Sequence, residues 1–204
     1  TNKSNKFDQA RNIVAFLDLA EGEYRGETNI FNTGFVKYNA GKIYPSNDLN
    51  DLYQNILNSY SGIRDVSQVT SILSPLAAQG FNGGRDYEKI ENARMLQSTE
   101  YQLNDKLGYI SLNSALNADE VLAVSYEFTI GGDVFRVGEF SNEVNLDAVS
   151  DAPSLILKLL KGTNLSPGVP TWDLMMKNIY YMGASRINVD DFFLDVLYQN
   201  DKTG

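Results

Sequence analysis

Carboxylates are the side chains of this chain with the most scope for chemistry, because histidine and cysteine are both absent. These absences exclude Ser-His-Asp triads, thiolate zinc sites and cysteine nucleophiles. Glycoside hydrolysis needs only two carboxylates at the right separation, so Glu120, Glu127 and Glu139 are candidates for it. Among 26 acidic residues, however, some pair will always look suggestive. We therefore expect a protein that is not an enzyme and has no catalytic residues.

Two polar clusters have side chains that could supply oxygen ligands to calcium. One consists of Asp190, Asp191 and Asp195, and the other is the run Asn47, Asp48, Asn50 and Asp51. Neither follows the pattern of an EF-hand loop, with its spaced ligands, central glycine and terminal glutamate. Caps of solvated strands and helices explain both clusters more simply. The sequence therefore predicts no metal ligands and no cofactor.

Aromatic side chains raise a further possibility, which is binding to a sugar or to a partner protein. The chain has 12 tyrosines, 10 phenylalanines and one tryptophan, and exposed rings of this kind can stack on pyranose faces. We single out Trp172, Tyr180 and Tyr181 as candidate ligand or partner contacts. Aromatic residues also favour strands and fill the cores of β-sandwiches, and core packing is the simpler interpretation of Trp172.

Length and charge limit the class of protein. A chain of 204 residues fits one domain, which we place over residues 1–204, and it is long enough to bury a core without disulfides. A net charge of −9 and the lack of a lysine-arginine stripe argue against nucleic acid as a partner. The chain has no apolar run of membrane-spanning length, and it opens Thr-Asn-Lys-Ser without a signal sequence. We expect a soluble module cut from a larger protein.

The first half of the chain predicts strands interrupted by helices. Residues 12–19 are apolar on both faces, which is typical of a strand in the middle of a sheet. A short strand is possible at residues 34–38. From Ser46 the apolar residues recur at i, i+3, i+4 and i+7, which predicts a helix, and a second helical stretch follows at Val66 to Leu76. We expect these to form a helical insertion near residues 47–78.

Glycine and asparagine mark the turns. Gly83-Gly84 lacks the lysine and the strand-loop-helix setting of a phosphate-binding loop, so we interpret it as a turn. A β-hairpin is predicted around Asn104-Asp105-Lys106, taken as a three-residue turn. That turn would place four apolar side chains on one face, namely Tyr101, Leu103, Leu107 and Tyr109.

A second β-hairpin is predicted from Val121 to Phe140, with its turn at Gly131-Gly132. A two-residue primed turn needs positive φ at both positions, and glycine adopts it without strain. The turn fixes the register of four pairs: Ile130 with Asp133, Phe128 with Phe135, Tyr126 with Val137, and Glu127 with Arg136. Most of the apolar residues then share one face, and the last pair is an ion pair across the strands.

Three later segments complete the prediction. Leu155 to Leu160 fits a helix or a strand, whereas Thr171 to Lys177 predicts one or two helical turns capped by Thr171. Asp191 to Gln199 alternates, which predicts a closing strand with Phe192 and Leu194 facing inward. The fold class that follows is mainly β: a two-sheet β-sandwich, with a jelly-roll as one arrangement, and the short helical insertion near residues 47–78.

Longer phrases of the sequence are specific enough to suggest a family. They are ARNIVAFLDLAEGEY near the start, STEYQLNDKLGYISLNSALNADEVLAVSYEF followed by VFRVGEF between Arg94 and Glu139, LKLLKGTNLSPGVPTWDLMMKNIYYMGA from Leu157 to Ala184, and FFLDVLYQND near the end. Together they cover roughly half of the chain, in order, and resemble the SprA family of gliding motility and type IX secretion. No phrase from residues 28–84 contributes to the resemblance.

The resemblance implies one soluble, non-catalytic module of a very large outer-membrane translocon that passes folded proteins to the cell surface. Its partners would be other segments of the parent chain and secreted cargo or envelope proteins. The location would be the cell envelope, on the periplasmic or cell-surface side, with contact to the outer membrane through the parent chain only. The alternatives from the residues alone are a carbohydrate-binding β-sandwich at the cell surface and, third, a surface glycosidase.

Overall fold

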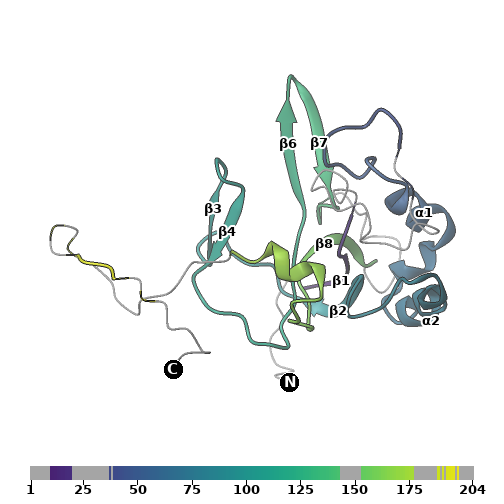
Figure 1. The fold of residues 1–204 in the computed structure, drawn as a ribbon. Coiled ribbons are helices and arrows are strands. Elements are labelled where there is room, and N and C mark those ends of the chain that lie inside the picture. The colour runs from purple at the N-terminus through teal and green to yellow at the C-terminus, as the bar shows by residue number, and fades with distance from the viewer. Residues whose placement is uncertain are drawn as a thin grey trace.

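The computed structural model describes residues 10–19, 37, 39–142, 153–176, 188, 190, 192–195 and 197. Over these residues the protein is mainly β, with strands β1 to β8 and a few short helices (Figure 1). One sheet has four strands in the order β2-β1-β8-β5, and two further pairs, β3-β4 and β6-β7, form separate hairpins. The prediction of a mainly β chain is confirmed.

Strand β1 (Arg11–Phe16) lies inside the four-stranded sheet, as its apolar run predicts. It pairs antiparallel with β2 (Tyr87–Ala93) and parallel with β8 (Leu155–Lys161), while β5 (Leu122–Val124) forms the far edge against β8. The segment that fits both helix and strand in the sequence is therefore a strand. Its place beside β1 decides this, since both strands are largely buried.

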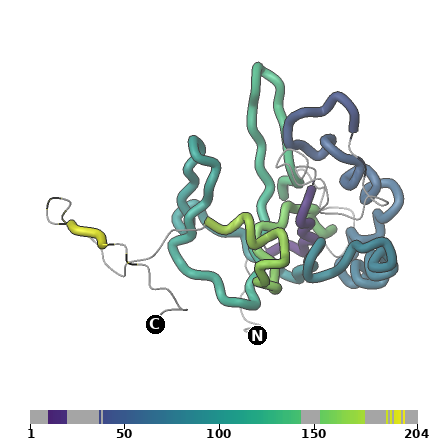
Figure 2. Tube along the Cα trace, viewed as in Figure 1, coloured from purple at the N-terminus to yellow at the C-terminus, as the bar shows by residue number. Residues whose placement is uncertain are grey.

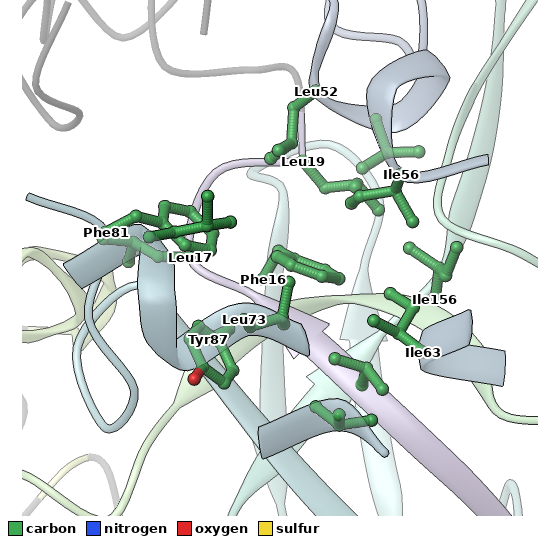
Figure 3. Packing of buried hydrophobic residues seen from close by; sticks show 14 residues of the cluster. Phe16, Leu17, Leu19, Leu52, Ile56, Ile63, Leu73, Phe81, Tyr87 and Ile156 are labelled. Carbon is green, nitrogen blue, oxygen red and sulfur yellow. The ribbon is translucent and has the colours of Figure 1, made fainter. Parts of the chain in front are cut away.

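Helices inserted between β1 and β2 cover one face of this sheet. They are α1 (Leu52–Ser59), the 3₁₀ turn η1 (Ser61–Arg64), α2 (Val69–Leu73) and the 3₁₀ turn η2 (Ser74–Gln79). Figure 3 shows Leu52, Ile56, Ile63 and Leu73 from these helices packed around Phe16 and Ile156 of the sheet. The predicted insertion is confirmed, but its helices begin later than predicted, at Leu52 and Val69, and the second changes to a 3₁₀ turn at Ser74, where Pro75 lacks a backbone donor.

The hairpin of β6 (Tyr126–Ile130) and β7 (Asp133–Val137), which projects from the body of the protein in Figure 2, has the predicted register at every pair. Gly131 and Gly132 have φ of 62° and 98°, the positive values that a primed turn requires. Rings stack along one face, with Phe128 and Phe135 centroids 5.4 Å apart. Local turn chemistry therefore suffices to predict this hairpin.

The hairpin of β3 (Tyr101–Asn104) and β4 (Tyr109–Leu112) also forms, but its predicted turn is wrong. Asn104 pairs with Tyr109, so four residues, 105–108, connect the strands and Gly108 takes a positive φ of 68°. Leu107 consequently lies in the loop and is exposed, instead of sharing a face with Tyr101. The Asn104 side chain stabilises the longer turn by accepting a hydrogen bond from the backbone N–H of Leu107.

The predicted helical turn near the C-terminus is confirmed as η3 (Pro170–Leu174), but its predicted cap is wrong, because Thr171 is buried inside the turn and Val169 holds the capping position. The prediction for the end of the chain is also wrong. The predicted closing strand is absent from the residues described there, 192–195 and 197, which lie in no strand. Phe192 and Leu194 are exposed and do not face inward, because alternation makes a strand only where a partner strand supplies hydrogen bonds. The possible strand at 34–38 lies outside the described residues, Lys37 excepted.

Candidate functional site

A pocket of about 630 Å³ lies between strand β7 and the loop of residues 41–48. Val134, Phe135 and Arg136 line it from the strand, and Lys42, Ile43 and Tyr44 line it from the loop, while Tyr53 of α1 also contributes. Its volume falls in the range of roughly 300–1,000 Å³ that is typical of ligand sites. The pocket is therefore the candidate binding site.

Asn47 holds the loop against the hairpin. Its backbone N–H donates to the carbonyl of Arg136 at 2.8 Å, and its side chain both donates to the carbonyl and accepts from the N–H of Gly138, at 3.1 and 2.8 Å. Tyr44 adds an edge-to-face contact with Phe135, with ring centroids 5.0 Å apart. These contacts fix one wall of the pocket to the other.

A buried ion pair stands beside this pocket and joins the helical insertion to the sheet. The Arg64 guanidinium forms a bidentate ion pair with the Glu139 carboxylate, with both N···O distances at 2.6 Å. Tyr53 donates its hydroxyl to the same carboxylate at 2.8 Å, and the N–H of Ile156 in β8 donates at 2.9 Å. Two further hydrogen bonds join Arg64 to Ser154. The Arg64 guanidinium donates to the backbone carbonyl of Ser154, and the backbone N–H of Ser154 donates to the carbonyl of Arg64.

These contacts determine the electrostatics of Tyr53 and Arg64. Burial, followed by the hydrogen bond to and the charge of Glu139, raises the pKa of the Tyr53 hydroxyl well above its usual range. Burial lowers the pKa of Arg64, but its hydrogen bond to and ion pair with Glu139 outweigh that effect and raise it. Both groups therefore stay protonated at physiological pH, so the Tyr53 hydroxyl keeps the proton that it donates to Glu139.

None of the three carboxylates nominated for hydrolysis has the surroundings of an acid-base catalyst. Each oxygen of Glu139 accepts two hydrogen bonds, which uses the roughly four acceptor sites of a carboxylate. Glu127 forms the predicted ion pair with Arg136 at 2.7 Å. Glu120 accepts from the backbone N–H of Asn117 at 2.7 Å and is exposed. Glu139 therefore offers no free acceptor site to a substrate, and none of the three carboxylates lines the pocket.

The first candidate calcium cluster has structural roles instead. Asn50 accepts from the N–H of Leu52 at the start of α1, and Asp51 accepts from the N–H of Lys37. Asn47 joins the loop to β7, as described above. Of the second cluster, Asp190 and Asp195 are described and exposed, and Asp191 lies outside the described residues. Within the described ranges, no three acidic side chains lie close enough together to hold a metal ion.

The aromatic candidates are placed only in part. Trp172 lies in η3, which packs against β8, and its side chain is half-buried. Tyr180 and Tyr181 lie outside the described residues. Three rings line the pocket, namely Tyr44, Tyr53 and Phe135, and none of them was a candidate contact in the sequence. The predicted helix and hairpin contain Tyr53 and Phe135, whereas no sequence signal marks Tyr44.

The chain matches no model of a known protein family, and it matches no curated protein. Among the described helices, none has the length and apolar character needed to span a membrane.

Proposed function

We propose that this chain is a non-catalytic structural and protein-interaction module of an outer-membrane protein-secretion translocon of the SprA type, with a role in gliding motility. The proposal places it in the cell envelope, attached to the outer membrane through its parent chain. Its partners would be other segments of that parent and secreted cargo or envelope proteins. The resemblance of the long sequence phrases supports the secretory role.

The observation that supports a non-catalytic role is the saturated state of Glu139. It is the one nominated carboxylate that is buried, and four donors already occupy its oxygens. A general acid or base needs a free position toward the substrate. A carboxylate held in this way serves to connect elements of the fold.

The projecting hairpins support the interaction role. Leu103 and Leu107 on the β3-β4 hairpin and Val134 on β7 are exposed apolar side chains. Both hairpins stand out from the body of the protein in Figure 1. Exposed apolar side chains on projecting hairpins are suited to contact with another protein surface.

We further propose that the β6-β7 hairpin and the four-stranded sheet are the two layers of a β-sandwich. Val137 of β7 and Tyr126 of β6 belong to the same apolar cluster as Val14 and Ile156 of the sheet. A shared core of this kind is what two packed sheets require. The jelly-roll arrangement remains one form of this proposal.

A pull-down with the immobilised full chain tests the secretory role. We expect it to retain envelope or secreted proteins from a gliding bacterium, and we expect Leu103→Ser with Leu107→Ser to release them. The matched control is Lys106→Ser, which changes the same loop without removing an apolar contact. If the parent chain retains no such protein, the proposed role is wrong.

A carbohydrate-binding module is the second candidate, because Tyr44 and Phe135 line a pocket of suitable size. Glycan-array binding that is lost in Tyr44→Ala would favour it, with Trp172→Ala as a second test of an aromatic platform. An array without any bound glycan would exclude this candidate.

A further inference from the structure

The outer edge of β7 presents unused backbone groups to the pocket. In a two-residue hairpin the residues next to the turn, Ile130 and Asp133, form a hydrogen-bonded pair, and such pairs then alternate along the ladder. Val134 and Arg136 therefore direct their N–H and C=O groups away from β6. The carbonyl of Arg136 confirms this direction, because it accepts from the N–H of Asn47 across the outer edge at 2.8 Å.

Val134 is the residue at which this edge is open. No hydrogen bond reaches its backbone from the described part of the chain outside the hairpin ladder. Its side chain lines the pocket and is 59% exposed. An exposed strand edge with free backbone groups and apolar side chains is a template for a further strand.

The chain also contains an apolar segment, residues 192–195 with Leu197, that lies in no strand of the described chain. Phe193 and Leu197 are each 91% exposed, and Phe192 and Leu194 are exposed as well. The segment stands apart from the β6-β7 hairpin in Figures 1 and 2. Its sequence alternates as that of a half-buried strand does, but its described residues pair with no other described strand.

Charge favours the meeting of these two surfaces. Lys42 lines the pocket and forms no ion pair with another described residue, whereas Arg136 beside it is paired with Glu127. Asp190 and Asp195 flank the apolar segment and are exposed. Asp48 also lines the pocket and opposes this attraction in part. The free lysine is nonetheless complementary to an acidic, apolar strand.

We propose that residues 192–195 of one copy of the chain add as a strand to the outer edge of β7 in a second copy. The segment would bond to the backbone of Val134 and place apolar side chains against Ile43, Tyr44 and Phe135. The contact is heterologous, so it generates rings or open chains of copies and not a closed twofold dimer. This self-pairing goes beyond the proposed secretory role and does not depend on it.

Binding of a fluorescent peptide with the sequence of residues 190–199 to the full chain tests the proposal. Val134→Pro removes the outward N–H but no ladder hydrogen bond, since proline is tolerated where a strand N–H faces out. One lost backbone hydrogen bond corresponds to an affinity about fivefold weaker. Val134→Thr keeps the N–H and is the matched control, for which we expect nearly unchanged affinity.

A charge exchange covers the case in which Val134→Pro disturbs the hairpin. Lys42→Glu should weaken binding of the peptide. A second peptide, with lysine at the positions of Asp191 and Asp195, should bind the Lys42→Glu variant more tightly than it binds the parent chain. Sedimentation of the full chain should show assembly that rises with concentration and that excess peptide reverses. A peptide that fails to bind, binding that both substitutions leave unchanged, or a chain that stays monomeric at every concentration would each overturn the proposal. None of these outcomes bears on cargo capture at Leu103 and Leu107.

Discussion

Replacing Glu139 with glutamine tests whether the buried ion pair connects the helical insertion to the sheet. The glutamine side chain has nearly the same shape, but it offers one acceptor oxygen and a donating NH₂ group. Four donors converge on the carboxylate in the parent, so the amide leaves about two of them without an acceptor. It also leaves the charge of Arg64 uncompensated.

The exposure of the two partners sets the expected size of the effect. Glu139 is 8% exposed and Arg64 27% exposed, whereas Glu127 and Arg136 of the hairpin pair are 40% and 38% exposed. Breaking a buried pair costs about 3–5 kcal/mol, and the partial exposure of Arg64 places Glu139→Gln near 3 kcal/mol, the lower end. The matched control Glu127→Gln breaks a surface pair and should cost at most about 1 kcal/mol.

Urea unfolding of the parent and the two variants measures this difference. With a slope of about 2 kcal/mol per molar urea, Glu139→Gln should lower the unfolding midpoint by about 1.5 M and Glu127→Gln by about 0.5 M or less. The slope itself should stay the same if both variants still fold in one transition. Equal losses of stability in the two variants would refute the assignment of Glu139 as the buried connection.

Three further predictions follow from individual contacts. Tyr53→Phe removes a hydrogen bond to charged Glu139 and should lower the free energy of unfolding by about 1.5–3 kcal/mol. Because the pKa of Tyr53 is raised, the variant should also lack one tyrosine that ionises late in an alkaline absorbance titration of the parent. An unchanged titration would contradict this. Burial raises the pKa of Asp86 in the folded state. The protonated side chain therefore contributes stability at pH values below the ordinary pKa of aspartate, and this contribution is lost as the pH rises through the raised pKa. Relative to the parent, Asp86→Asn should therefore gain stability in denaturant unfolding between pH 3 and pH 7, and a relative loss over that range would be the wrong sign. Gly131 has a φ of 62° and no neighbour near its Cβ position, so Gly131→Ala should lower the stability measured by thermal unfolding by about 1–2 kcal/mol. Gly138→Ala should lower it more, because the added Cβ would lie 3.0 Å from another side chain. Equal losses would count against this close approach.

Three features follow from the sequence alone because their causes are local. The β6-β7 register follows from two glycines that take positive φ, and the helical insertion follows from the spacing of apolar residues such as Leu52 and Ile56. The central place of β1 follows from an apolar run on both faces. In each case neighbouring residues carry enough information to decide the backbone conformation.

Tertiary structure decided the rest, because the deciding contacts join residues far apart in the chain. Glu139 looked like one of many carboxylates until Tyr53, Arg64 and the backbone of Ile156 came together around it. The segment containing Leu194 has the pattern of a strand but no described partner, so its alternation did not produce one. A side-chain pattern states what an element can bury, whereas only the meeting of distant segments supplies the hydrogen bonds and the buried surface.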